Sequence, residues 1–276
     1  MSGPGLRAGV MGWPIAHSRS PRLHGFWLRR YGIDGAYDPV PVPPGTFERE
    51  LRRLVEEGWR GANVTIPHKE AALAAADEAT PRARAIGAAN TLLFGAGGRI
   101  LADNTDAFGF LENLKDRAPA WRPARPALVL GAGGASRAVI HALLEAGAPE
   151  IRLANRTVAR AEALAAAFGP RVRVLPFAEA GSHLAGAGLI VNTTSLGMKG
   201  APPLDLDLAG AEPDALATDI VYTPLITPFL GAAAARDLAI VDGLGMLLHQ
   251  ARPGFAAWFG VEPEVDDALR AVMLEP

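Results

Sequence analysis

The sequence predicts an α/β fold with largely parallel sheets, and two observations lead to this prediction. Short apolar runs alternate with alanine-rich segments of helical period along the chain, which is typical of βαβ units. In addition, the segment 127–148 has the pattern of a buried strand, a glycine-rich turn and an amphipathic helix, an order found in doubly wound domains. The 276 residues are enough for two domains or one large one.

The individual elements follow from the same alternation. Aliphatic and β-branched runs predict strands at 6–11, 36–41, 61–66, 91–94, 127–130, 151–155, 172–175, 189–192, 217–221 and 239–241. Amphipathic stretches, many of them rich in alanine, predict helices at 21–31, 45–57, 69–77, 81–85, 107–116, 134–146, 157–167, 225–236, 244–259 and 265–273. Pro67 ends the third strand and suits the first turn of the helix behind it, where its missing N–H costs nothing. The Pro- and Arg-rich segment 116–126 lacks periodicity and indicates a connection between domains, and a second break falls near 241–246.

Composition excludes several classes of function. A net charge of −2 gives no general attraction to nucleic acid or to anionic membranes. No apolar run is long enough to predict a transmembrane helix, and the N-terminal residues lack the apolar segment of a signal peptide. The absence of cysteine excludes disulfides and thiol catalysis, and the histidines show no metal-ligand spacing. We therefore expect a cytoplasmic globular protein without a metal.

The glycine-rich turn predicts nucleotide binding. Gly131, Gly133 and Gly134 would let the backbone approach a pyrophosphate closely, while the helix N-terminus behind them supplies N–H donors. The third position of the usual glycine pattern holds Ser136, so the match is imperfect. Glycine turns also occur for packing alone, but the strand before and the helix after both favour a nucleotide site.

The next strand favours NADP over NAD. An NAD site usually ends this strand with an acid that binds the ribose 2′-hydroxyl. This chain instead has Asn155, Arg156 and Thr157, with Arg160 one helical turn onward. A guanidinium can bind a 2′-phosphate in a forked geometry, whereas a carboxylate would repel it. The alternative is that both arginines merely occupy a helix start, although cations are disfavoured there without an anion nearby.

Lys69 lies in the first turn of a predicted helix, where the helix dipole disfavours a cation by roughly 0.3–1 kcal/mol. A solvated surface lysine is the simplest explanation. Ser18, Ser20, Asn90 and Asp106, however, also stand among turn residues and strand ends. Taken singly, Ser20 and Asp106 could be ordinary helix caps. Taken together, these side chains would surround Lys69 with hydroxyls, an amide and a carboxylate, which favours a catalytic role.

A series of motifs, kept in order and spacing from about residue 9 to 251, resembles the shikimate dehydrogenase family. These motifs are SRSP, NVTIPHK, GAANT, DNTDAFGF, LGAGGASRA, NRT, NTTSLGM, DIVYTPLITPFL and DGLGMLLHQA. The resemblance implies an enzyme that reduces 3-dehydroshikimate to shikimate with NADPH, on the way to chorismate and the aromatic amino acids. It implies an N-terminal α/β substrate domain (1–106 with 242–276), a Rossmann-type doubly wound NADP-binding domain (107–241) and an active site in the cleft between them.

The resemblance also assigns residues. Lys69 and Asp106 match the catalytic pair, and Ser18 and Ser20 match the hydroxyls that hold the substrate carboxylate. The residues that match the hydroxyl-binding set are Thr65, Asn90, Asp106, Tyr222 and Gln250. Those that match cofactor contacts are Gly131, Ala132, Gly133, Gly134, Ala135, Asn155, Arg156, Thr157, Arg160, Ile220 and Gly243.

Several alternatives stay open. A quinate/shikimate dehydrogenase of dual specificity shares nearly all these motifs, although Ser20 and Arg156 count against it. A regulatory module that binds NADP without turnover is a candidate from another class, against which the retention of both Lys69 and Asp106 argues. Ala107, which follows the aspartate, leaves the shape of the pocket open. The partner is expected to be the small-molecule substrate, with no nucleic acid or membrane, and the chain could be a monomer or a homodimer.

Overall fold

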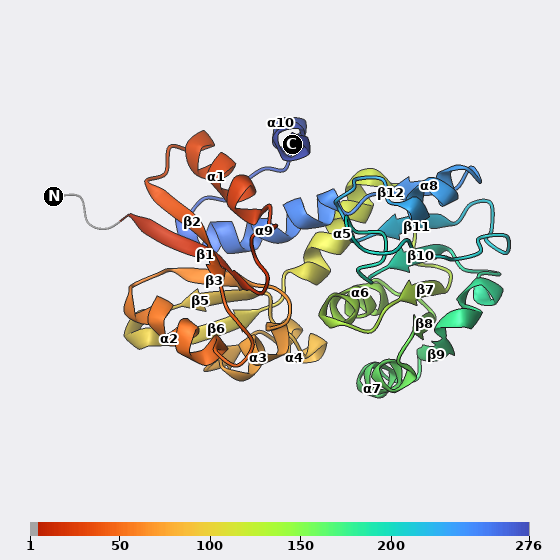
Figure 1. Cartoon of the computed structure of the whole chain (residues 1–276), viewed down its shortest axis with the longest axis horizontal. Coiled ribbons are helices and arrows are strands. Elements are labelled where there is room, and N and C mark those ends of the chain that lie inside the picture. The colour runs from red at the N-terminus through yellow and green to blue at the C-terminus, as the bar shows by residue number, and fades with distance from the viewer. Residues whose placement is uncertain (1–4, 276) are drawn as a thin grey trace. The chain divides into compact units, whose positions relative to one another are not determined.

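The computed structural model describes residues 5–275 and divides into two compact units (Figure 1). Unit 1 contains residues up to Asp106 together with Leu247 onward, and unit 2 is the continuous stretch Ala107–Met246. Each unit is built around its own sheet with helices on both faces, so the predicted α/β class is confirmed.

Within the described part of unit 1, six strands form one mixed sheet in the order β2-β1-β3-β5-β6-β4. These strands are β1 (Leu6–Gly12), β2 (Gly35–Pro41), β3 (Gly61–Val64), β4 (Glu78–Ala79), β5 (Thr91–Phe94) and β6 (Ile100–Asp103). Strands β2, β1 and β3 are parallel, whereas β5 runs antiparallel to both β3 and β6. The expected parallel arrangement therefore holds for only part of this sheet. In the antiparallel register, Asn63 of β3 lies directly opposite Thr91 of β5.

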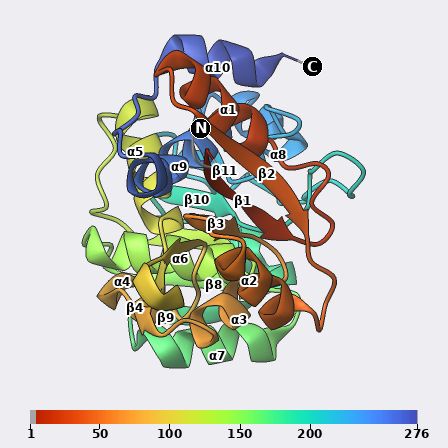
Figure 2. The same ribbon diagram turned by 90° about the vertical axis from the view of Figure 1, so that its left-hand side faces the viewer.

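Helices cover both faces of the unit 1 sheet. They are α1 (Ser20–Arg30), α2 (Phe47–Glu56), α3 (Lys69–Ala74), α4 (Pro81–Ile86), the 3-10 turn η1 (Ala96–Gly98), the part of α9 (Leu244–Phe259) from Leu247 onward, and α10 (Asp267–Leu274). Figure 2 shows α1 on one side of β1 and β2 and α2 on the other. The α2 side is packed by aliphatic and aromatic side chains such as Phe47, Leu51 and Leu54. On the other side, α1 and α9 bring aromatic rings together around the fully buried His24.

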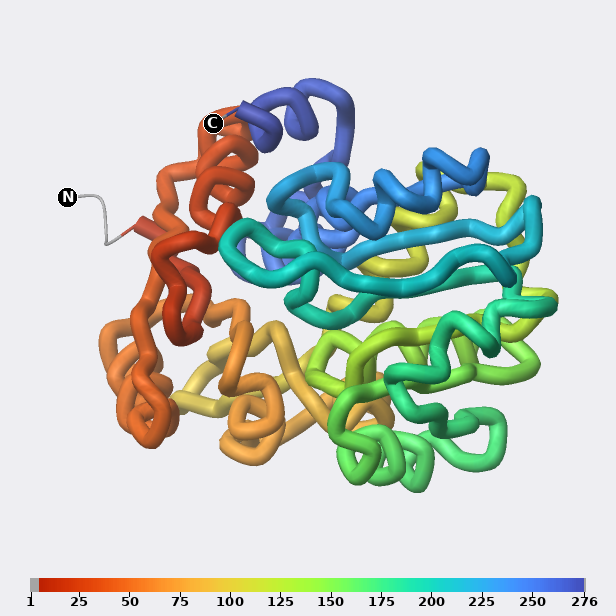
Figure 3. The backbone as a smooth tube through the Cα atoms, turned by 45° about the vertical axis from the view of Figure 1, so that its right-hand side comes forward, coloured from red at the N-terminus to blue at the C-terminus, as the bar shows by residue number. Residues whose placement is uncertain are grey.

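The C-terminal helix belongs to this second layer. Helix α10 lies beside α1, as the blue and red segments show in Figures 1 and 3. The Arg19 guanidinium donates to the carbonyl of Met273 over 2.5 Å, and Arg30 pairs with Asp266 at the start of α10. Residues more than 230 positions apart in the sequence therefore stabilise one layer of unit 1.

Unit 2, all of which is described, has six strands in the order β12-β11-β10-β7-β8-β9, every neighbouring pair parallel. The strands are β7 (Ala127–Leu130), β8 (Ile151–Asn155), β9 (Val172–Pro176), β10 (Leu189–Asn192), β11 (Leu216–Asp219) and β12 (Ala239–Val241). Numbered within the unit this order is 3-2-1-4-5-6, the doubly wound order of dinucleotide-binding domains. Such sheets bind ligands at the carboxyl ends of the strands where the order reverses, here between β7 and β10.

The helices of unit 2 are α5 (Asp106–Arg117), which starts at the last residue of unit 1, α6 (Gly134–Glu145), α7 (Val158–Phe168), the 3-10 turn η2 (Phe177–His183) and α8 (Pro228–Ala234). Strand β7 ends at Leu130 and α6 starts at Gly134, while β8 ends at Asn155 and α7 starts at Val158, so both strands pass almost directly into their helices. Leu128, Leu130 and Ile190 contribute to a buried core with Phe229 and Leu230 of α8.

Every strand and helix expected from the sequence is present, but some details differ. Strands β4 and β6 and the two 3-10 turns were not expected. The strand expected at 61–66 ends at Val64, and the following helix begins at Lys69 with His68 as its N-cap. Pro67 therefore precedes the helix, and the expected place in its first turn is wrong. The segment 116–126 joins α5 to β7 inside unit 2 and is not a connection between the units.

Candidate active site

The centre of the candidate site in unit 1 is an ion pair between Lys69 and Asp106. Lys69 is the first residue of α3 and Asp106 the first residue of α5. The Lys69 ammonium donates to Asp106 Oδ2 over 2.5 Å, and the two side chains are only 14% and 8% exposed. The explanation of Lys69 as a solvated surface lysine is therefore wrong. The carboxylate supplies the anion that makes a cation tolerable at the start of a helix.

Asp106 is held in place by neighbouring amides. Its backbone N–H, at the first residue of α5, donates to Asn104 Oδ1 over 3.1 Å. Its carboxylate accepts from Asn90 Nδ2 over 2.8 Å. The same Nδ2 group lies 3.1 Å from Gln250 Oε1 on α9. Four residues expected from the sequence, Lys69, Asp106, Asn90 and Gln250, thus form one connected group in unit 1.

A set of buried polar side chains behind Asn90 was not expected from the sequence. Asn90 Oδ1 accepts from the backbone N–H of Thr105 over 2.7 Å and from the Thr91 hydroxyl over 3.0 Å. Thr91 is also 3.1 Å from Asn63 Nδ2, and Asn63 Oδ1 accepts from the Tyr37 hydroxyl over 2.6 Å. An asparagine inside the β-branched run at 61–66 was the one signal of this network, because a buried amide requires partners.

Ser18 and Ser20 lie together at the start of α1. The Ser20 N–H donates to Ser18 Oγ over 3.3 Å, which draws the two hydroxyl-bearing residues into one turn. The N-cap of α1 is Arg19 and makes no side-chain capping bond, so Ser20 is not the cap. Ser20 is only 7% exposed. Burial raises the pKa of Tyr37 well above its usual value, and a hydrogen bond with Ser20 partly opposes this shift.

Thr65 follows β3 and is half-buried, with its backbone N–H donating to Met11 over 2.9 Å. Among residues 5–275, we find no hydrogen bond from Ser18, Ser20 or Thr65 to the Lys69–Asp106 pair. The structure therefore places these residues in the same unit without joining them directly to the pair.

The glycine loop of unit 2 follows β7 at the point where the strand order reverses. Gly131 has φ +108°, and a Cβ atom there would lie 2.8 Å from Thr193 Oγ1. Gly133 faces open space and is exposed, so the backbone at this position can be approached from outside. Helix α6 begins at Gly134, which points its first free N–H groups toward the same region.

Ser136 explains the imperfect glycine pattern. Its hydroxyl accepts from the Gly133 N–H over 3.1 Å and lies 2.6 Å from Thr193 Oγ1 at the end of β10. The side chain is fully buried. Ser136 therefore ties the glycine loop to the neighbouring strand, and it leaves the exposed face of the loop open.

A group of polar residues follows β8, the strand next to β7 in the sheet. Arg156 and Arg160 are exposed at the start of α7, and Asn155 Nδ2 donates to the carbonyl of Thr157 over 2.8 Å. The carboxyl end of β8 neighbours that of β7, so both arginines follow the same edge of the sheet as the glycine loop. A forked guanidinium there suits a phosphate group.

Ile220, Tyr222 and Gly243 occupy the other side of the reversal point. A Cβ atom on Gly243 would lie 2.6 Å from the Ile220 carbonyl oxygen, so only glycine allows this approach. The loop that carries Ile220 and Tyr222 is fixed by Asp219, which accepts from Asn192 Nδ2 over 3.0 Å and from the Val221 N–H over 2.9 Å. Burial raises the pKa of Asp219, and these hydrogen bonds oppose the shift.

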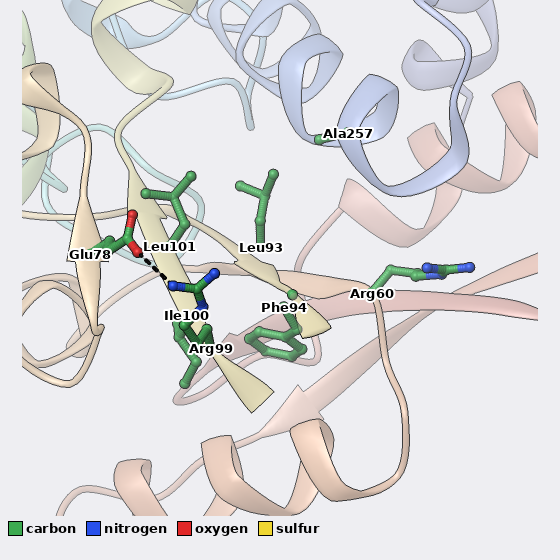
Figure 4. Close-up of a pocket in the computed structure, with 9 residues that line it drawn as sticks. Arg60, Glu78, Leu93, Phe94, Arg99, Ile100, Leu101 and Ala257 are labelled. Atoms are coloured by element: carbon green, nitrogen blue, oxygen red, sulfur yellow. Dashed lines mark hydrogen bonds and ion pairs between the residues drawn. The ribbon is translucent and has the colours of Figure 1, made fainter. Parts of the chain in front are cut away.

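A cavity of about 320 Å³ in unit 1 lies apart from these residues (Figure 4). Leu93 and Leu101 point from β5 and β6 toward Ala257 of α9. None of the residues expected to be functional lines this cavity. The residues that line it are Arg60, Glu78, Leu93, Phe94, Gly95, Arg99, Ile100, Leu101 and Ala257. The converging polar groups are elsewhere, so we place the site at the Lys69–Asp106 pair.

Within residues 5–275, no group of three or more His, Cys, Asp or Glu side chains is placed so that it could bind a metal ion. Over the same residues, no helix combines the length and apolar character needed to cross a bilayer.

Comparison with known proteins gives a consistent result. Family models match residues 10–92 (shikimate dehydrogenase substrate binding domain), 115–198 (shikimate/quinate 5-dehydrogenase) and 243–273 (shikimate 5′-dehydrogenase C-terminal domain). A shikimate dehydrogenase (NADP(+)) of Rhodospirillum rubrum is 61% identical over 99% of both chains. A shikimate 5-dehydrogenase of Thermus thermophilus, solved with NADP(H) and shikimate, has a TM-score of 0.85 and 41% identity over 97% of both chains. A quinate dehydrogenase of Corynebacterium glutamicum, solved with NAD, has a TM-score of 0.90 and 28% identity, covering 98% of this chain and 99% of the other.

The doubly wound sheet with its glycine loop is typical of the class of dinucleotide-dependent oxidoreductases. The comparisons narrow this class, because the similarity extends over nearly the whole chain. The chain belongs to the shikimate dehydrogenase family.

Proposed function

We propose that this protein catalyses the reversible, NADPH-dependent reduction of 3-dehydroshikimate to shikimate, with Lys69 and Asp106 as its catalytic pair. The observation that carries this proposal is the 2.5 Å contact between the Lys69 ammonium and Asp106, which is buried and held by Asn90. The reaction serves the pathway to chorismate and the aromatic amino acids.

The pair suits the chemistry of ketone reduction. Bound NADPH supplies the hydride. As the carbonyl carbon is reduced, negative charge develops on its oxygen, and a positioned proton donor stabilises that charge. The Lys69 ammonium is such a donor, and its hydrogen bond to Asp106 fixes its direction. In the reverse direction, neutral Lys69 would take the proton from the shikimate hydroxyl.

Substrate binding is proposed for further polar residues. Ser18 and Ser20 would donate to the substrate carboxylate from the turn that their mutual hydrogen bond defines. The residues proposed to bind the substrate hydroxyls are Thr65, Asn90, Asp106, Tyr222 and Gln250. The Asn90 amide donates to both Asp106 and Gln250, which supports a hydroxyl site there.

NADP would be held by unit 2. The open backbone of Gly133 and the free N–H groups at the start of α6 fit a pyrophosphate. We assign Gly131–Ala135, Asn155, Arg156, Thr157, Arg160, Ile220 and Gly243 to this site, with the exposed guanidinium groups of Arg156 and Arg160 on the 2′-phosphate. The proposed NADP-binding domain is 107–241, and the substrate domain is 1–106 with 242–276.

We further propose a cytoplasmic location, which suits a chain without cysteine. A second candidate function is dual activity on shikimate and quinate, favoured by the similarity to the quinate dehydrogenase of Corynebacterium glutamicum. A third, an NADP-binding module without turnover, is opposed by the intact pair.

One assay separates these candidates. The forward reaction is followed as NADPH oxidation with 3-dehydroshikimate, from the absorbance of the reduced nicotinamide at roughly 340 nm. The reverse reaction is followed with shikimate or quinate as substrate and with NADP or NAD as cofactor. Turnover of shikimate but not quinate, with NADP but not NAD, supports the proposal. Turnover of both substrates supports dual specificity, and NADP binding without turnover supports the regulatory module. Asp106→Asn serves as the matched inactive control, because it keeps the shape of the side chain.

A further inference from the structure

The buried polar residues behind Asn90 form a single chain of hydrogen bonds that leads to Asp106. We call it the Tyr37–Asp106 chain; its members in order are Tyr37, Asn63, Thr91, Asn90 and Asp106. The three central members are between 1% and 5% exposed, so solvent does not supply alternative partners. The direction of each bond can be worked out, because the chain contacts one backbone group that can only accept a hydrogen bond and another that can only donate one.

The first fixed point is the carbonyl of Asn90, which can only accept. Asn63 faces it over 3.0 Å, so this end of the Asn63 amide must be the N–H₂ group. The other end is therefore the carbonyl oxygen, and the Tyr37 hydroxyl must donate to it over 2.6 Å. The same N–H₂ group donates to the Thr91 hydroxyl over 3.1 Å.

The second fixed point is the backbone N–H of Thr105, which can only donate. It faces the Asn90 side chain over 2.7 Å, so that end of the amide is Oδ1. Thr91 accepts from Asn63, and its own proton can go to Asn90 Oδ1, 3.0 Å away, or to the Thr105 hydroxyl, 3.1 Å away. The Thr105 hydroxyl itself donates to Asn90 Oδ1 over 3.1 Å, so on either route Oδ1 is the acceptor. The opposite end, Nδ2, then donates to Asp106 Oδ1 over 2.8 Å.

All bonds in the chain therefore run in the same direction, from Tyr37 to Asp106. Bonds aligned in this way polarise one another and strengthen the last donor. If the Asn90 amide were rotated by half a turn, its oxygen would face the Asp106 carboxylate and its N–H₂ group would face the Thr105 N–H. Both contacts would be repulsive.

We propose that Thr91, supported by Tyr37, is a positioning residue that acts together with the N–H and hydroxyl of Thr105 to hold the orientation of the Asn90 amide, and so gives each oxygen of Asp106 a donor. One oxygen then takes the Asn90 N–H, and the other is left to hold the Lys69 ammonium. Thr91 is 1% exposed and acts through Asn90 without touching the substrate. This inference rests on the proposed function for its catalytic consequence, while the direction of the chain does not depend on it.

The test compares Thr91→Val with Thr91→Ser. Valine keeps the shape and loses the hydroxyl, whereas serine keeps the hydroxyl and loses the methyl group. Loss of a hydrogen bond inside a buried network should lower kcat/KM for shikimate by about tenfold in Thr91→Val, and Thr91→Ser should stay within about threefold of the parent. Thr218→Val, at another strand threonine that is 2% exposed, is the matched control and should behave as the parent does.

A second readout needs no turnover. The side-chain amide of Asn90 is observed by ¹⁵N NMR, assigned with Asn90→Asp, and followed in the apoprotein of each variant. We expect its resonances to move in Thr91→Val and in Tyr37→Phe and to stay near the parent's in Thr91→Ser. Tyr37→Phe also serves as the second variant if Thr91→Val fails to fold.

The outcomes separate the two proposals. Thr91→Val with parental kcat/KM and an unmoved Asn90 amide would overturn the inference, as would equal losses in the valine and serine variants. A parent that binds NADP but does not oxidise shikimate would refute the proposed function, and the amide resonances would still decide whether the chain is directed as described.

Discussion

Removal of the Lys69 ammonium is the most direct test of the site. Lys69→Ala takes away the proposed proton donor and leaves the Asp106 carboxylate, 8% exposed, with the Asn90 amide as its neighbour. General acid catalysis contributes about 10²–10⁴ in rate, so kcat should fall by that factor, equivalent to roughly 3–5 kcal/mol of transition-state stabilisation. Loss of a hydrogen bond to a charged group should also lower the free energy of unfolding by about 1.5–3 kcal/mol.

The assay is steady-state shikimate oxidation, with circular dichroism to establish that the variant is folded at the assay temperature. Lys115→Ala is the matched control, because the Lys115 ammonium also meets a carboxylate, Glu112, over 2.8 Å but is 69% exposed. NADPH affinity should hardly change in either variant, since the glycine loop belongs to unit 2 and Lys69 to unit 1. A Lys69→Ala protein that turns over within a few-fold of the parent would refute the catalytic assignment.

Three further outcomes are expected. Arg156→Asp should weaken NADPH binding by about 1.5–3 kcal/mol in a fluorescence titration, because a carboxylate replaces the guanidinium proposed to meet the 2′-phosphate. Shikimate should be preferred to quinate by about 10–200-fold in kcat/KM, since quinate adds a hydroxyl beside the carboxylate assigned to Ser18 and Ser20. Burial lowers the pKa of His24 to about 3. As the pH falls below 6.5, His24 therefore becomes protonated in the unfolded chain but stays neutral in the folded protein until about pH 3. Stability should therefore fall between pH 6.5 and 3, by up to about 1.4 kcal/mol per pH unit, and urea unfolding of His24→Phe should show less of this loss.

Each of these expectations can fail. Equal use of NADP and NAD by the parent would remove the role given to Arg156. Comparable kcat/KM for the two substrates would make the protein an enzyme of dual specificity. The His24 argument depends on a ring that stacks on Tyr37 at 3.8 Å and has no hydrogen-bond partner for either nitrogen among the described residues. It would be contradicted if parent and His24→Phe lost the same stability between pH 7 and pH 5.

The sequence was informative where local pattern decides structure. The run at 127–130, the glycines and the helix behind them follow one another without interruption, so strand, turn and helix could all be predicted. Lys69 and Asp106 could be singled out because each stands at the start of a helix, a position with its own electrostatic preference.

Pairing between distant strands could not be predicted in the same way. Thr91 lies opposite Asn63 only because β5 runs antiparallel to β3, and no local pattern reports that direction. Strand β4 has two residues, too few for a period to be recognised. The contact between Asn90 and Gln250 depends on α9, a helix that begins more than 130 residues after α5 starts.

The division of the chain has a consequence for its synthesis. Unit 2 is continuous and can fold as soon as residue 246 has emerged from the ribosome, since domains generally fold as units. Unit 1 must wait: Trp27 is fully buried with its indole N–H on the carbonyl of Glu264, and Trp258 donates to the carbonyl of Leu92. The apolar side chains in the N-terminal part of unit 1 thus stay uncovered while unit 2 is being made. Unit 1, which carries the Lys69–Asp106 pair, is completed only after α9 has been made, so a nascent chain interrupted before that point contains a complete unit 2 and an incomplete unit 1.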